Sequence, residues 1–114
     1  GDIPEQLDFI DELPDYSTDL YVSKKMKTNE DSSLEILRQI LPVMEAMDDF
    51  SDEAVHTAMF DLIAKLGVKN GYLLWPLRIA LSGKQFTPGG GIELAAVLGK
   101  EKAVARVKAA IQRL

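Results

Sequence analysis

The sequence predicts an all-α protein, a bundle of six or seven helices joined by short connections. Apolar residues recur every three or four positions through most of the 114 residues, which is the period of one helix face. Capping and stopping residues stand at the ends of these segments, and no segment alternates as a strand does. The length suits one domain, residues 1–114, with helical subregions at about 1–66 and 67–114.

The first two helical segments are short. Pro4 suits a first helical turn and Pro14 stops the chain from continuing as a helix, so a helix is expected over residues 4–13. The apolar residues within 18–22 predict one or two further turns.

A longer amphipathic helix follows a lysine-rich loop. Ser32 or Ser33 can cap it, and its apolar stripe extends to Met47. Pro42 lies inside this segment, where a proline removes one backbone hydrogen bond, so we expect a kink there.

The next two helices have clear ends. Ser51 is a good N-cap, and Gly67 stands where a left-handed residue commonly ends a helix. Residues 70–82 are apolar in every helical direction, which predicts a buried central helix that ends at Gly83. Pro76 within it should kink or restart the helix.

A loop and two more helices complete the chain. Residues 84–91, with the sequence KQFTPGGG, are the strongest loop signal because they combine a proline with three consecutive glycines. A short helix over 92–98, ended by Gly99, precedes the last helix over 100–114. The inner stripe expected for that last helix is Val104, Val107, Ile111 and Leu114.

Charge is distributed unevenly between the two halves. Residues 1–64 hold 16 acidic and 4 basic residues, a net of −12, whereas residues 65–114 hold 2 acidic and 9 basic residues, a net of +7. This asymmetry indicates either an anionic partner for the basic half or two halves that attract each other.

The sequence excludes most catalytic and metal-binding sites. There is no cysteine, and His56 is the only histidine, which is more typical of a surface or half-buried residue than of a ligand. The glycine run lacks the lysine and hydroxyl residue of a P-loop. We therefore expect no catalytic residue, no metal and no cofactor in this chain. No apolar run approaches the length of a membrane span, so we also expect no membrane contact.

The glycine-proline loop and the basic residues around it favour RNA binding. Such a loop can bring its backbone against unstacked bases, which is how single-stranded RNA is mainly read. The cations that we expect to contact phosphates are Arg78, Lys84, Lys100 and Arg106. Arg78 stands in an apolar segment, so an ion pair with an acid of the first half is an equal alternative for it.

Three segments and their spacing carry a family resemblance. PLRIALSG at residues 76–83, TPG at 87–89 and LGKE at 98–101 closely resemble the C-terminal end of bacterial glutamyl-tRNA synthetases. The resemblance implies that this chain is the all-helical anticodon-binding domain of a class I aminoacyl-tRNA synthetase, a glutamate–tRNA ligase. Its catalytic domain would precede it in the parent chain and use ATP and Mg²⁺.

The resemblance also implies partners and site residues. Thr87, Pro88 and Gly89 would approach the anticodon bases, and Gly90 lies where some members carry a bulkier residue that contacts a base. The partners would be tRNA(Glu), with tRNA(Gln) as a second candidate, and the catalytic domain of the same chain, in the cytoplasm. The alternative function is a helical protein-interaction module, for which an exposed apolar patch would be needed.

Overall fold

The computed structural model describes residues 18–24, 27–83 and 90–114. These residues confirm the all-α class, with five α-helices, one 3-10 helix and, apart from an isolated bridge between Ser23 and Thr28, no β-structure. The helix expected over residues 4–13 lies outside the described residues. In chain order the elements are η2 (Thr18–Tyr21), α2 (Glu30–Ala46), α3 (Asp52–Leu66), α4 (Asn70–Ser82), α5 (Gly91–Leu98) and α6 (Lys100–Arg113).

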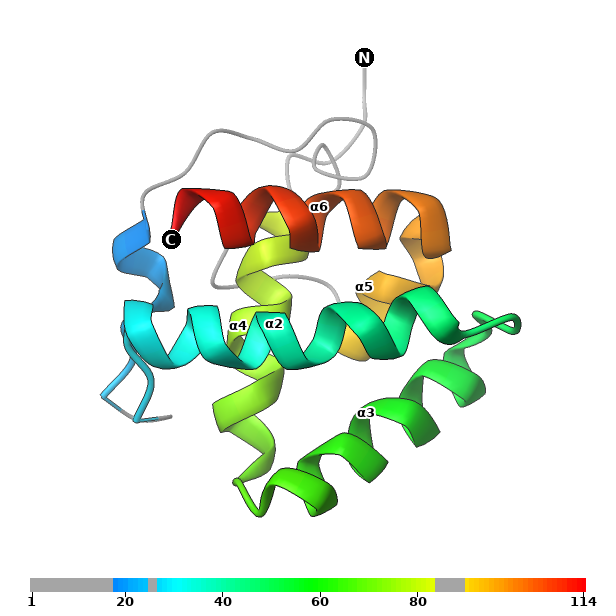
Figure 1. The fold of residues 1–114 in the computed structure, drawn as a ribbon, viewed down its shortest axis with the longest axis horizontal. Helices are drawn as coiled ribbons and strands as arrows, with labels where there is room; N and C mark the ends of the chain where they lie inside the picture. The colour runs from blue at the N-terminus through cyan, green and yellow to red at the C-terminus, as the bar shows by residue number, and fades with distance from the viewer. Residues whose placement is uncertain (1–17, 25–26, 84–89) are drawn as a thin grey trace.

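The helices form two crossing layers (Figure 1). α2 and α6 lie side by side, and α4 runs across behind them and packs on both. α3 and α5 pack on each other and on α4 at one end of this arrangement. The two helices that flank residues 84–89, α4 and α5, are therefore direct neighbours.

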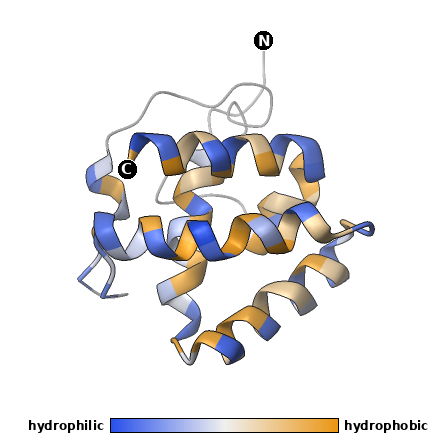
Figure 2. Ribbon diagram, in the orientation of Figure 1, coloured by the Kyte–Doolittle hydropathy of each residue, from blue (hydrophilic) through white to orange (hydrophobic). Residues whose placement is uncertain are grey.

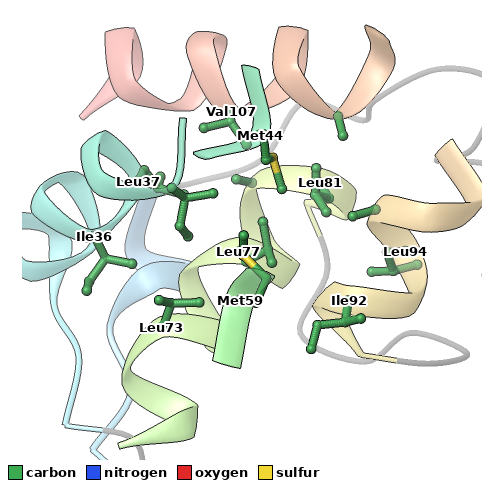
Figure 3. Packing of buried hydrophobic residues seen from close by; sticks show 14 of the residues in the cluster. Ile36, Leu37, Met44, Met59, Leu73, Leu77, Leu81, Ile92, Leu94 and Val107 are labelled. Carbon is green, nitrogen blue, oxygen red and sulfur yellow. The ribbon is translucent and has the colours of Figure 1, made fainter. Parts of the chain in front are cut away.

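One hydrophobic core joins all of these helices. Leu37 and Met44 of α2 point toward Leu77 and Leu81 of α4, with Val107 of α6 above them (Figure 3). Because this core includes residues on both sides of position 66, the two helical subregions share one interior. The turn between α3 and α4 is therefore a connection inside one packed unit.

The start of α2 differs from the expected one. Asn29 is the N-cap, and its side chain accepts from the Ser32 backbone N–H at 2.7 Å while the Ser32 hydroxyl accepts from the Asn29 N–H at 2.9 Å. This reciprocal pair satisfies two donors that the first helical turn leaves without a partner. The prediction of a cap at Ser32 or Ser33 was therefore wrong, since Ser32 lies inside the first turn and Ser33 is buried.

The predicted ends of α3 and α4 are confirmed. The Ser51 hydroxyl accepts from the Ala54 N–H at 3.2 Å, and Gly67 and Gly83 have φ values of 69° and 68°. Glycine adopts this left-handed conformation more readily than residues with a side chain. α4 does not restart at Pro76, since it is one helix from Asn70 to Ser82 with Pro76 inside it.

α6 is amphipathic, as its alternating hydropathy shows (Figure 2), but its buried face is shifted from the expected stripe. Ala103, Arg106, Val107 and Ala110 are its buried residues, and of the four expected residues only Val107 is fully enclosed. The sequence pattern missed this face because alanines are weak apolar markers and because an arginine occupies one of its positions.

Candidate nucleic-acid interface

The two ends of the predicted RNA-binding loop are fixed on helices. Thr87, Pro88, Gly89 and Lys84 lie outside the described residues. Before this segment, the Gly83 N–H donates to the Ile79 carbonyl at 2.7 Å and so closes the end of α4.

Gly90 begins α5 on the other side of the segment. It has an extended backbone, with φ −91° and ψ −176°. Its N–H donates to Oε2 of Glu93 at 3.0 Å, and its carbonyl accepts from the Leu94 N–H at 3.0 Å. Since α4 and α5 pack on each other, the chain leaves one helix and enters its neighbour within a short stretch.

A pocket of about 290 Å³ opens beside Gly90. It is formed where α3, α4 and the start of α5 meet, so residues from both charged halves of the sequence contribute to it. Its walls are His56, Phe60, Leu74, Arg78 and residues 90–93. This is at the small end of the range for ligand pockets, which suits one flat ring.

Arg78 is the predicted phosphate contact that the structure places at this pocket. Its guanidinium carbon lies 5.9 Å from the centre of the Trp75 ring, within the range of a cation–π interaction. A Cβ atom added to Gly90 would lie 3.8 Å from Nη2 of Arg78, so the guanidinium reaches the start of α5. The position fits RNA contact, and whether Arg78 holds a phosphate stays a prediction.

Two aromatic residues of this pocket were missed by sequence reasoning. The rings of His56 and Phe60 on α3 are stacked, with centroids 4.4 Å apart and an angle of 28° between their planes. The signal available in the sequence was their spacing of four residues, which places two side chains on the same face of a helix. What the spacing does not reveal is that this face is turned toward Arg78 and Gly90.

Lys100, another predicted phosphate contact, lies away from this pocket. Its Nζ donates to the Met47 carbonyl at 2.6 Å, where Met47 is the C-cap of α2. A cation at a helix C-terminus is favourable because the last carbonyls have no partner within the helix. Lys100 therefore joins the start of α6 to the end of α2, and its role toward RNA stays a prediction.

Arg106 has a structural role that the sequence did not predict. Its side chain is buried at 8% exposure, and its Nη1 donates to the Leu81 carbonyl at 2.6 Å in the last turn of α4. Burial lowers the pKa of the Arg106 guanidinium, because a low-dielectric surrounding disfavours the charged form. The side chain of Arg106 therefore faces the interior, and the phosphate contact expected of it stays a prediction.

A second, larger hollow lies between α2 and α6. It measures about 560 Å³ and includes Glu45, Lys100, Val104 and Lys108. Nζ of Lys108 lies 3.6 Å from Oε2 of Glu45, an exposed ion pair across the hollow. Neither Gly90 nor Arg78 contributes to it, so the smaller pocket is the better candidate despite its size.

The described residues form no candidate metal site. Within residues 18–24, 27–83 and 90–114, no group of three histidine or acidic side chains is placed to hold an ion. In this part of the chain, no helix is both long enough and apolar enough to span a membrane.

Comparison with known proteins identifies the family. Residues 1–111 match the family model described as "Anticodon binding domain". The chain is also 57% identical over 114 residues to a glutamate–tRNA ligase of Clostridium tetani, 52% over 116 residues to one of Clostridium botulinum strain Eklund 17B, and 50% over 114 residues to one of Clostridium acetobutylicum. Each match covers 100% of this chain and 23–24% of the relative.

The resemblance expected from residues 76–83, 87–89 and 98–101 is thereby confirmed. The chain spans about a quarter of the length of the curated relatives it matches, and the match covers the whole of the chain. The all-helical fold of the described residues agrees with that assignment. The protein belongs to the anticodon-binding domain family, in the form that glutamate–tRNA ligases carry.

Proposed function

We propose that this domain binds the anticodon of tRNA(Glu), as part of a glutamate–tRNA ligase that esterifies glutamate to the tRNA. The match of the full chain to glutamate–tRNA ligases at 50–57% identity carries the proposal. tRNA(Gln) is a second candidate substrate of the parent enzyme. The parent would act in the cytoplasm, where bacterial tRNAs are aminoacylated.

In this proposal the chemistry belongs to a catalytic domain elsewhere in the parent chain. ATP and Mg²⁺ would be used there, as the resemblance to glutamyl-tRNA synthetases implies. The domain itself would contribute binding and orientation of the tRNA, without a cofactor. The comparisons do not favour the alternative of a helical protein-interaction module.

The recognition has two parts. The backbone of Thr87, Pro88 and Gly89, together with Gly90, would contact the edges of unstacked anticodon bases. Arg78, Lys84 and Lys100 would neutralise phosphates, which positions the RNA without reading its sequence. The pocket at Gly90 supports this division because Arg78 and Gly90 both line it.

Binding to two tRNA transcripts tests the proposal. We expect the 114-residue chain to bind a tRNA(Glu) transcript more tightly than the same transcript with a changed anticodon, since only base contacts differ between them. If about four phosphates are contacted, the slope of log K against log salt should be roughly −3 to −4 for both. Equal affinity for the two transcripts would contradict anticodon recognition.

A further inference from the structure

We infer that the stacked rings of His56 and Phe60 form a platform on which one unpaired anticodon base stacks. This inference rests on the proposed function and extends it to α3, a helix in the acidic half of the chain. It assigns a role in RNA binding to two residues that neither the charge pattern nor the family motifs indicate.

The two rings are already stacked and held in place. Phe60 is half-buried and packs against the hydrophobic core, so its position is fixed by the interior. His56 is exposed and stacks on Phe60 at 4.4 Å. An aromatic pair that is already stacked can extend to a third flat ring with little loss of side-chain freedom, and every base offers such a ring.

A pocket lies beside the two rings. Both rings line it, and Arg78 and Gly90 also border it. A Cβ atom at Gly90 would lie only 3.1 Å from Oε2 of Glu93, so the space directly at Gly90 is already taken by that side chain. The room for a ring brought by the RNA is therefore the pocket that His56 and Phe60 line, about 290 Å³ in volume.

Charge at the pocket also favours a base over a phosphate inside it. The Glu93 carboxylate stands at the border of the pocket and opposes a phosphate there, whereas a carboxylate oxygen can accept from the amino group of a base. Arg78 borders the same pocket on α4, and the proposed function assigns its guanidinium to a phosphate next to the stacked base. The interior of the pocket therefore suits an uncharged ring with polar edges.

The alternative is that His56 and Phe60 form only a surface pair within one helix. Such pairs stabilise helices slightly and need no ligand. The two interpretations differ in what happens when the outer ring is removed. If the rings are only a surface pair, removing the outer ring changes the stability of α3 and leaves RNA binding unchanged. If they form a platform, removing it weakens the contact to one nucleotide of the bound RNA.

The experiment uses an anticodon stem-loop of tRNA(Glu) with 2-aminopurine placed in turn at each of the three anticodon positions. Stacking on a protein ring quenches this fluorophore, so the wild-type chain should quench one position more than the other two. We expect His56→Ala to abolish that quenching and to weaken binding at least about fivefold, the lower end of the stacking effect per base. His56→Phe keeps a ring at the same site, so it should keep both the quenching and the affinity of the wild type.

Thr57→Ala is the matched control, because Thr57 is exposed on α3 and lines a different hollow. It should bind as the wild type does, and urea unfolding verifies that all three variants remain folded. If His56→Ala leaves both quenching and affinity unchanged while the wild type still discriminates against a changed anticodon, the platform is wrong and the proposed function stands. If the wild type does not discriminate against the changed anticodon, both the platform and the proposed function are contradicted.

Discussion

The α2–α6 layer and the pocket between α3, α4 and α5 use their cations differently. On α6, Lys100 and Arg106 each donate to a backbone carbonyl near the end of another helix, Met47 after α2 and Leu81 in α4. At the pocket, Arg78 lies over the Trp75 ring and beside Gly90, at the start of α5.

This difference shows why a count of basic residues does not locate an RNA site. Carbonyls at helix C-termini lack partners within their own helix, and a long cationic side chain is a good donor for them. Part of the positive charge of residues 65–114 therefore stabilises the fold. Variants of Arg106, Arg78 and Lys100 test this division, and variants of the two glycines at the start of α5 test the packing beside the pocket.

Replacing Arg106 should affect stability most. Arg106→Met keeps an unbranched side chain but leaves the Leu81 carbonyl without this donor. Hydrogen bonds to charged groups contribute about 1.5–3 kcal/mol, so we expect a loss of that order in the free energy of unfolding, measured in urea. The salt dependence of RNA binding should not change.

The control for Arg106 is Lys108→Met on the same helix. Lys108 is exposed and pairs with Glu45 at the surface, and such pairs contribute little. A similar loss in both variants would show that the burial of Arg106 is not what matters. A smaller salt slope of RNA binding in Arg106→Met would indicate that Arg106 does contact a phosphate.

The two glycines at the start of α5 should respond very differently to alanine. In Gly91→Ala the new Cβ would lie 3.1 Å from Cγ of Leu77 and 3.2 Å from the Leu74 carbonyl oxygen, a backbone atom that cannot easily move. We expect a loss of about 1–3 kcal/mol in unfolding free energy, as for other overpacked sites.

Gly90→Ala is the matched comparison. Its nearest neighbour would be Oε2 of Glu93, the end of a flexible side chain, and its φ of −91° suits any residue. It should therefore unfold like the wild type. Equal destabilisation of both variants would contradict the close packing of α5 on α4 at Gly91.

Arg78 and Lys100 should separate binding from stability. Arg78→Gln should reduce the magnitude of the salt slope by about 1, as expected for one lost phosphate contact. Lys100→Gln should lower the unfolding free energy by about 1 kcal/mol, since it loses its bond to Met47, and should change the slope less. If both variants changed the salt slope equally and Lys100→Gln unfolded like the wild type, the distinction between a binding role for Arg78 and a stabilising role for Lys100 would be wrong.

Local sequence signals predicted much of the fold. Ser51, Gly67 and Gly83 act through their own backbone and nearest neighbours, so their roles could be predicted without tertiary contacts. The start of α2 was missed because Asn29 and two serines compete as caps, and only the reciprocal bond between Asn29 and Ser32 decides among them.

The candidate site was only partly predictable. Arg78 could be selected because a cation stands out in an apolar segment, and Gly90 could be selected through the family resemblance. His56 and Phe60 could not, because their relevance depends on how α3 packs against α4 and α5. The burial of Arg106 likewise depends on where α6 meets the end of α4.

Trp75 gives the domain an internal optical reporter. It is the one tryptophan of the chain, its indole N–H donates to the Leu20 carbonyl at 3.0 Å, and Arg78 lies over its ring. Indole emission depends on neighbouring charge. Occupancy of the pocket can therefore be followed by intrinsic fluorescence, in unlabelled protein and with unmodified tRNA, through the same arginine that borders the site.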